Sequence, residues 1–259
     1  MYYRVDYQLA ILLGGFIAGI LCSRRVQKVP ASQLARMYYA VIAILLVLRT
    51  VAFAGSMLTV RQNFWTTGGG ILSDLSFILY GGLFGLATRR RDSRELLTDS
   101  EILSALCMTL AFTFAIAGIA KAFSMTPMTE FFSQSGYSVV FLKFIVFAEV
   151  FGAIGLLLPW AVVTALIGLT IDMFGAVVTH VHNGDPLNDS TGAICMLIRL
   201  AVLGVLWMLR PWLGDSEATV RSSMLTVGVV GVVCLLSAIG GSVVMRHLGS
   251  HAAISAVSR

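Results

Sequence analysis

Charged side chains are scarce in this chain. Asp, Glu, Lys and Arg together make up 12% of the 259 residues, about half the share found in soluble globular proteins. Hydrophobic residues make up 58%, and the mean hydropathy is +0.88. Little chain remains that is polar enough for a soluble domain. We therefore expect most of the chain to lie in a lipid bilayer.

Cysteine is also scarce, and its spacing argues against two kinds of site. The chain has no Cys-x-x-Cys pair and no spacing typical of metal ligands, which disfavours a dithiol redox centre and a structural zinc site. The cysteines lie in or at the ends of apolar stretches, at Cys22, Cys107, Cys195 and Cys234. We predict no metal site from them.

Eight apolar stretches divide the sequence. A hydrocarbon core about 30 Å thick needs about 20 apolar residues per helix. The expected spans are residues 7–22, 37–57, 68–88, 101–121, 138–158, 161–181, 193–213 and 222–245. The first is flanked by charged residues and is expected to be a retained helix, not a signal peptide. The sequence thus predicts an all-α integral membrane protein with about eight transmembrane helices.

Loop charges predict the orientation of these spans. The net charge of +5 is concentrated in two short loops, 24–36 and 89–94, and follows no amphipathic face, so nucleic acid is not expected as a partner. Arginine-rich loops of membrane proteins face the cytoplasm. We therefore expect a multi-pass protein of the plasma membrane, the bacterial inner membrane, with the 181–192 loop and both termini outside.

Small residues recur one helical turn apart in two spans. Gly15 and Gly19 form one such pair, and Gly81 and Gly85 form another. Pairs of this kind let helices approach closely. The sequence leaves two interpretations open, namely ordinary contacts within the chain and dimerisation.

The loop 121–138 carries the signals of a short helix. Thr126 and Pro127 are typical of a helix start, with the threonine as N-cap, and Gly136 is typical of a helix end. We expect this helix to lie along the membrane surface, with a plain loop as the alternative. Its apolar face would be formed by Met128, Phe131 and Phe132.

Ionisable residues occur inside the apolar stretches. Each costs about 2.5–3.5 kcal/mol at mid-bilayer on insertion scales, so each needs a partner or a function. These residues are Arg49, Asp74, Glu149, Asp172 and Arg199. Arg49 and Asp74 lie at similar depths in consecutive spans joined by a short loop, and we expect them to form an ion pair.

Part of the chain resembles the DoxX family. The resemblance rests on the text FTFAIAGIAK at 112–121, on Pro127, Phe131 and Gly136, and on EVFGAIGLLLP at 149–159 and DMFGAVVTH at 172–180. With the next span it covers about 101–213. It implies a four-helix membrane bundle there, with a three-helix segment before it (1–95) and a further transmembrane helix and tail after it (222–259).

The resemblance also bears on function. Some members are described as small subunits of quinol-oxidising or thiosulfate:quinone oxidoreductase complexes, and others have no assigned activity. It therefore implies a membrane subunit of a redox or respiratory assembly, acting as a scaffold or facing quinone. The sequence fixes no cofactor besides this suggestion of quinone, and it leaves open whether the protein is an enzyme. Other redox or membrane subunits are the expected partners.

Five residues are expected to line one pocket in the outer half of that bundle. Asp172 and His180 lie on one helical stripe, i and i+8, while Glu149 and Arg199 reach a similar depth from neighbouring spans. The full set is Lys121, Glu149, Asp172, His180 and Arg199. Such a pocket could take a headgroup, a quinone ring or a proton. The alternative is a set of buried ion pairs that only set helix register.

Two further interpretations stay open. Haem is disfavoured because His180 has no opposed histidine in a facing span, and a surface metal at His180, His182, Asp185 and Asp189 is a minor alternative. For the whole protein, the alternatives to a redox subunit are an assembly factor or chaperone without chemistry and a transporter of a small solute. Against the transporter, no inverted repeat is visible.

Overall fold

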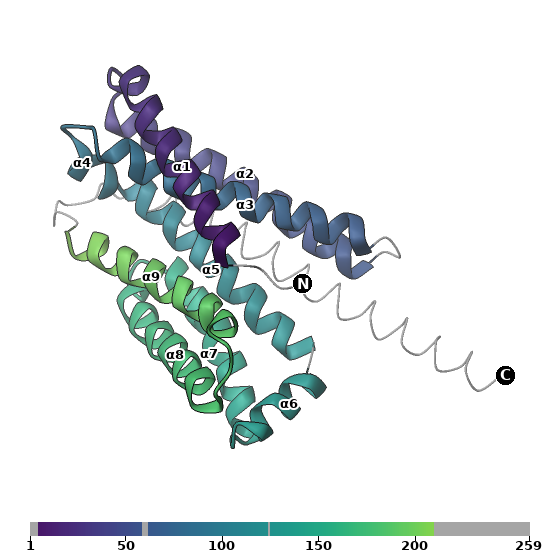
Figure 1. Ribbon diagram of the computed structural model, residues 1–259. Helices are drawn as coiled ribbons and strands as arrows, with labels where there is room; N and C mark the ends of the chain where they lie inside the picture. The colour runs from purple at the N-terminus through teal and green to yellow at the C-terminus, as the bar shows by residue number, and fades with distance from the viewer. Residues whose placement is uncertain (1–4, 59–61, 124, 210–259) are drawn as a thin grey trace.

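The computed structural model describes residues 5–58, 62–123 and 125–209. Within them the chain forms helices and no strands (Figure 1). In chain order the helices are α1 (Val5–Val26), α2 (Ala31–Leu58), α3 (Gln62–Ala87), α4 (Ser93–Leu97), α5 (Ser100–Phe123), α6 (Met125–Gln134), α7 (Val139–Leu157), α8 (Val162–Asn183) and α9 (Leu187–Leu209). The all-α fold class is therefore confirmed for this part of the chain.

Five helices in the described residues are long and apolar enough to cross a membrane. They are Ala31–Ala52 within α2, Ser100–Phe123, Val139–Leu157, Val162–Asn183 and Asp189–Leu209. A shorter apolar helical stretch, Ile71–Ala87, belongs to α3. The protein is thus a multi-pass membrane protein. The number of eight spans stays a prediction, and the expected span 222–245 lies outside the described residues.

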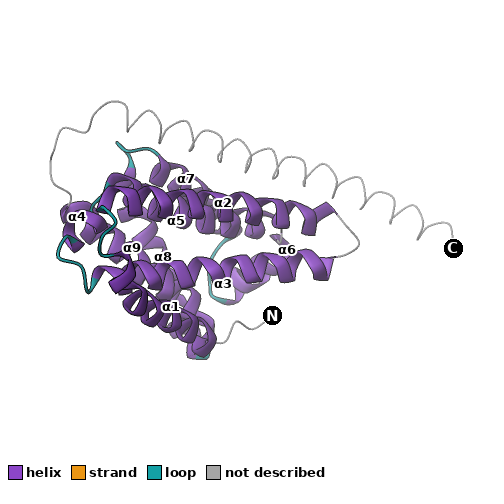
Figure 2. Cartoon of the chain, turned by 90° about the horizontal axis from the view of Figure 1, so that it is seen from above, coloured by secondary structure: helices purple, strands orange, loops and turns teal. Residues whose placement is uncertain are grey.

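The second half of the described chain forms a four-helix bundle. α5 packs against α7 and α9, and α8 packs against α7 and α9, so the four close into a ring. α2 packs on the outside of α5 and against α3, and α3 packs against α1. The short helices α4 and α6 lie at opposite ends of the molecule (Figure 1; Figure 2).

Helix α5 lies at the centre of both groups of helices. About two-thirds of the residues in its apolar stretch are buried, against less than a third in each of the other four candidate membrane spans. Its side chains belong to both hydrophobic cores, with Leu103 and Phe114 in one and Met108 and Phe112 in the other. A helix that is apolar all round is expected to be surrounded by protein, and α5 is the helix that the fold encloses.

The glycine pairs of α1 and α3 face each other. A Cβ at Gly15 or Gly19 would collide with the backbone of Ile78 or Gly82 in α3, and one at Gly85 would collide with that of Phe16 in α1. The two backbones therefore touch where side chains are absent. These faces are filled within the chain, as the interpretation of ordinary helix contacts predicts.

Arg90 links the connection between α3 and α4 to the connection between α1 and α2. Its side chain is only 4% exposed. It donates two hydrogen bonds to the Asp92 carboxylate, of 2.7 and 2.6 Å, and one each to the carbonyls of Val26 (2.8 Å) and Val29 (2.9 Å). Since Val26 ends α1, the guanidinium donates to a carbonyl that has no partner within the helix. This arginine, which the sequence suggested only as a marker of orientation, has a structural role.

The short helix predicted in the 121–138 segment is present as α6. It ends before Gly136, which has a left-handed φ of 82°, as a glycine at a helix end often does. The helix begins at Met125, so Thr126 lies inside its first turn and is not the N-cap. The helix was therefore correctly predicted, whereas the assignment of its cap was wrong.

Candidate functional site

A cavity of about 1330 Å³ lies inside the bundle and extends toward α3. Most of its walls are apolar, and side chains from α2, α3, α5, α6, α7, α8 and α9 line it. All five residues predicted to share a pocket lie on these walls: Lys121, Glu149, Asp172, His180 and Arg199. The structure thus brings them to one cavity, but it does not join them into one network of contacts.

Lys121 and Glu149 form an ion pair between α5 and α7. The Lys121 Nζ lies 2.5 Å from the Glu149 Oε1. A Cβ at Gly118, one turn before Lys121, would lie 3.3 Å from the Cβ of Glu149. The missing side chain therefore lets α7 approach closely enough for the lysine to reach the carboxylate. Glu149 is 1% exposed, and its second oxygen, Oε2, has no hydrogen-bond partner in the described part of the chain.

Asp172 is a carboxyl group without a basic contact among the described residues. Its Oδ2 is buried and makes no hydrogen bond there, and its charged neighbours are Glu149 and Lys121. Two carboxyl groups thus share the vicinity of one lysine. A buried polar atom without a partner is costly, so this group needs a proton or a donor from a bound molecule.

The small residues around the two carboxyl groups differ in what they touch. Ala153, near Glu149, is buried, and a Cβ at Gly152 would lie 2.5 Å from Leu169 of α8. A Cβ at Gly168 or Gly175, next to Asp172, would meet nothing within 4 Å. The small residues beside Glu149 therefore allow close packing of α7 against α8, whereas the glycines beside Asp172 leave open space at the cavity.

Three of the five intramembrane charges lie near the midpoints of their helices. Glu149 is the eleventh of 19 residues in α7, Asp172 the eleventh of 22 in α8, and Arg199 the thirteenth of 23 in α9. This places them deeper along the bundle than the outer half expected from the sequence. A molecule that contacts them must enter well between the helices.

His180 contacts Asp185 and not Asp172. Its Nδ1 lies 2.8 Å from the Asp185 Oδ2, and its ring lies 5.7 Å from that of Phe131, centroid to centroid. Among the described residues, no group of three His, Cys, Asp or Glu side chains could hold a metal ion. The metal interpretation of this loop, with His182 and Asp189, thus has no geometric basis in the described part.

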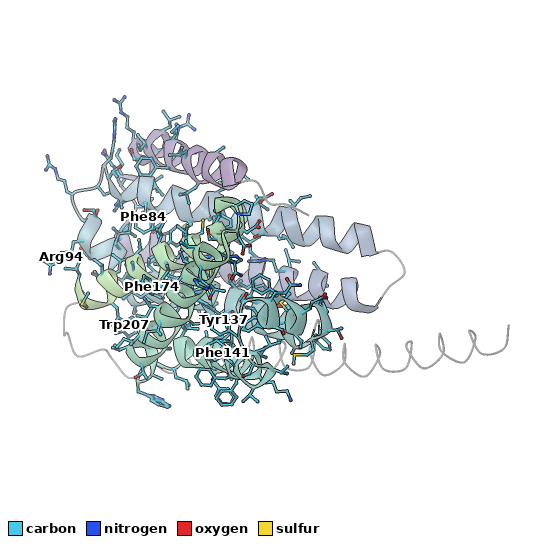
Figure 3. All side chains as sticks on the ribbon, turned by 60° about the horizontal axis from the view of Figure 1, so that its bottom comes forward. Phe84, Arg94, Tyr137, Phe141, Phe174 and Trp207 are labelled. Atoms are coloured by element: carbon cyan, nitrogen blue, oxygen red, sulfur yellow. The ribbon has the colours of Figure 1, made fainter. Side chains whose placement is uncertain are left out.

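Helix α6 covers one end of the cavity. Its apolar side chains Met128, Phe131 and Phe132 line the cavity wall. The expected position of this helix along the membrane surface stays a prediction. The turn after α6 is bonded to α8 through Asn183, whose amide donates to the Ser135 hydroxyl at 2.8 Å. Tyr137 stacks on Phe141 with ring centroids 5.0 Å apart at the start of α7 (Figure 3).

The cavity also reaches the outer surface of the bundle. Phe144 and Phe151 of α7 and Ile171 of α8 line it, although their side chains are 60%, 55% and 68% exposed. In a membrane protein such exposed apolar side chains face lipid. The cavity is therefore open to an apolar molecule arriving from the bilayer.

Arg199 lies on the wall formed by α9 and α3. Its guanidinium carbon is 5.5 Å from the ring centroid of Phe77 and 5.7 Å from that of Tyr80. Sequence reasoning missed both aromatic residues, because they lie in the segment before the expected bundle. Only the folded chain brings α3 beside α9, and no local pattern signals this.

Arg49 also lines the cavity, with its guanidinium carbon 4.8 Å from the ring centroid of Phe112. Asp74 belongs to α3, which packs against the α2 of Arg49. The expected ion pair between Arg49 and Asp74 stays a prediction.

The fold and the cavity define a class of protein: a multi-pass helical membrane protein whose four-helix bundle encloses a largely apolar site. The sequence of that bundle, residues 105–209, matches the model of the DoxX-like family. This confirms the family suspected from the sequence for a segment that is less than half of the chain, and α1 to α3 lie outside it. No curated protein and no solved structure matches the chain.

Proposed function

We propose that the bundle is a binding site for a quinone-class molecule within a membrane-embedded redox assembly. The proposal rests mainly on two carboxyl oxygens beside an apolar cavity, Glu149 Oε2 and Asp172 Oδ2, which have no hydrogen-bond partner among the described residues. These groups accept hydrogen bonds when ionised. They would therefore suit a ligand that brings hydroxyl donors, as the reduced, quinol form does.

The same carboxyl groups can take up a proton. Two carboxyl groups near one lysine leave one acid without a basic partner in the described residues. Oxidation of a quinol releases two electrons and two protons. Asp172 would accept one proton and the Oε2 of Glu149 the other, while the two electrons pass to a redox centre of a partner subunit. Lys121 holds the Glu149 carboxyl group in position through their ion pair.

The size and opening of the cavity suit an amphipathic ligand. Small-molecule sites commonly measure about 300–1,000 Å³, and this cavity is somewhat larger at about 1330 Å³. It has room for a ring and the first part of an isoprenoid tail. The tail would leave between α7 and α8 toward lipid, past the exposed Phe144 and Ile171.

The test is direct measurement of bound quinone. The full chain, purified from its native membrane in a mild detergent, is extracted with organic solvent and the quinone content is compared with the protein content. We expect near-stoichiometric quinone in the native protein and a loss in Gly168→Leu, which fills open space on the cavity wall. Gly204→Leu is the matched control, since Gly204 also meets nothing within 4 Å and does not line the cavity.

The partners that co-purify separate this proposal from its alternatives. A stoichiometric redox complex supports it. Quinone-free protein with transient membrane clients would favour an assembly factor, and solute flux in liposomes would favour a transporter.

We also propose that the protein lies in the plasma membrane with segments 24–36 and 89–94 on the cytoplasmic side. A cysteine replacing the exposed Asp189 in a chain without native cysteines should react with an impermeant reagent on intact cells, and one replacing Ser93 should not. The opposite labelling would overturn the orientation.

A further inference from the structure

The wall formed by α3 and α9 carries a positive charge that no described acid neutralises. Arg199 lies deep in the protein, and its electrostatic neighbours are Tyr38, Tyr80 and Cys195. Its one hydrogen bond in the described part goes to the sulfur of Met196, from Nη1 at 3.6 Å. A guanidinium has five N–H donors, so most of the Arg199 donors have no acceptor among the described residues.

The aromatic rings beside Arg199 stabilise the cation without neutralising it. Phe77 and Tyr80 offer ring faces to the guanidinium carbon at 5.5 and 5.7 Å, an interaction that favours a positive charge. The Tyr80 hydroxyl is buried and also lacks a hydrogen-bond partner among the described residues. Two unmatched donor groups thus lie close together beside the cavity.

Neither acidic side chain of the cavity contacts Arg199 in the described part of the chain. Glu149 is paired with Lys121, and the charged neighbours of Asp172 are those same two residues. The cavity therefore has an acceptor-rich wall on α7 and α8 and a donor-rich wall on α9 and α3, and these two walls do not neutralise each other by contact.

We propose that Arg199 and Tyr80 form an anion subsite, which holds the single deprotonated oxygen of an otherwise apolar molecule. The apolar cavity receives the body of the molecule, and the guanidinium receives its oxyanion. The inference concerns the charge of the ligand and stands apart from the proposed redox role. The oxyanion could belong to an acidic hydroxyquinone or to the carboxylate of a fatty acid.

Paired ligands that differ only in charge test this subsite. The probes are 2-hydroxy-1,4-naphthoquinone against its neutral methyl ether, and laurate against dodecanol. Binding to the full chain in a nonionic detergent is measured by ligand-induced thermal stabilisation and by equilibrium dialysis. We expect the anion of at least one pair to bind about tenfold or more tightly than its neutral partner, as a charged hydrogen bond provides. The pair that shows the preference identifies the source of the oxyanion.

Substitutions of Arg199 and Tyr80 test whether these residues cause the preference for the anion. Arg199→Gln should abolish it, and Arg199→Lys, which keeps the charge, should retain most of it. Tyr80→Phe should reduce the affinity for the anion about fivefold, the value of a neutral hydrogen bond. Tyr39→Phe is the matched control, because the Tyr39 hydroxyl is also buried without a described partner but does not line the cavity.

Filling the open space on the α9 wall tests the subsite without changing Arg199. Gly192 lines the cavity on α9 and has open space around it, so Gly192→Leu should block both members of a ligand pair, whereas Gly204→Leu should not. Equal binding of anion and neutral partner by the native chain would overturn the subsite, as would a preference that survives both Arg199→Gln and Tyr80→Phe. Quinone that binds without any preference for the anion would overturn the subsite alone and leave the proposed redox role standing.

Discussion

Glycine has opposite effects in the α1–α3 interface and in the cavity wall formed by α8 and α9. In α1 and α3, Gly15, Gly19 and Gly85 bring two helix backbones into direct contact. In α8 and α9, Gly168 and Gly192 touch nothing within 4 Å and leave space in the cavity wall. The same residue type thus closes one interface and opens another. A glycine in a membrane helix shows where side chains are absent, but it does not show whether a helix or a ligand takes the space.

The difference follows from what surrounds each glycine. Along α1 and α3 the small residues of both helices lie at the same level, so the surfaces are complementary and pack closely. Around Gly168 the facing side chains do not enter the gap. The α1–α3 interface is therefore expected to be sensitive to added volume, and the cavity wall around Gly168 and Gly192 to tolerate it.

Added volume in the α1–α3 interface should have the largest effect. Gly15→Leu places a side chain against the backbone of Ile78, which cannot move without separating the helices. We expect a loss of about 3 kcal/mol or more of unfolding free energy, at or above the upper end of overpacking effects. Thermal unfolding in detergent measures it. Gly14→Leu is the control in the same helix, because Gly14 is exposed and meets nothing within 4 Å; equal losses in both would refute the close contact.

Removal of the Arg90 side chain should have the next largest effect. Arg90→Ala removes the bonds to Asp92, Val26 and Val29. Hydrogen bonds to charged groups contribute about 1.5–3 kcal/mol each, though not additively, so we expect a loss of about 3 kcal/mol. The neighbouring Arg91 is exposed, and Arg91→Ala should change stability by less than about 0.5 kcal/mol.

The same contact predicts a dependence on pH. The hydrogen-bonded guanidinium of Arg90 lowers the pKa of the Asp92 carboxyl below its ordinary value. A lowered folded-state pKa stabilises the fold above the ordinary carboxyl pKa, and this contribution is lost as the pH falls through the lowered pKa. Acid titration of stability should show this loss in the native chain. Asp92→Asn should lack it, and an unchanged titration in that variant would contradict the prediction.

The two carboxyl groups of the cavity should differ in their effect on stability. Glu149→Gln leaves Lys121 without its ionised partner and should cost about 1–3 kcal/mol. Asp172→Asn removes no described ion pair and should cost less than about 1 kcal/mol while lowering quinone content. If both variants unfold the protein, the carboxyl groups serve only to set helix register. If both are stable and quinone content is unchanged, the cavity has no role in binding.

The smallest effect on stability is expected where the cavity wall gains volume. Gly168→Leu adds a side chain in open space and should change unfolding free energy by less than about 1 kcal/mol, close to its helix-propensity effect. Its thermal unfolding should resemble that of Gly204→Leu. A loss of stability as large as that of Gly15→Leu would contradict the contrast between the α1–α3 interface and the cavity wall.

Much of the fold was predictable because the hydrophobic effect acts on local sequence. The apolar stretches at 101–121, 138–158 and 161–181 predicted α5, α7 and α8 closely, and Pro127 and Gly136 marked α6. The face of α6 was not predictable, since Met128 and Phe131 suit a membrane surface and a cavity wall equally well. Only the position of α6 over the bundle shows that these side chains line the cavity.

The same division holds for the candidate site. The cost of charge in an apolar helix was enough to single out Glu149, Asp172 and Arg199 from the sequence, and the bundle itself was recognisable from its motifs. Tertiary structure decided which charges meet. Lys121 reaches Glu149 because Gly118 lets α7 approach, and Arg199 lies against Phe77 because α3 packs beside the bundle. Hydropathy is a property of each segment, whereas contacts between charges depend on how distant segments approach one another.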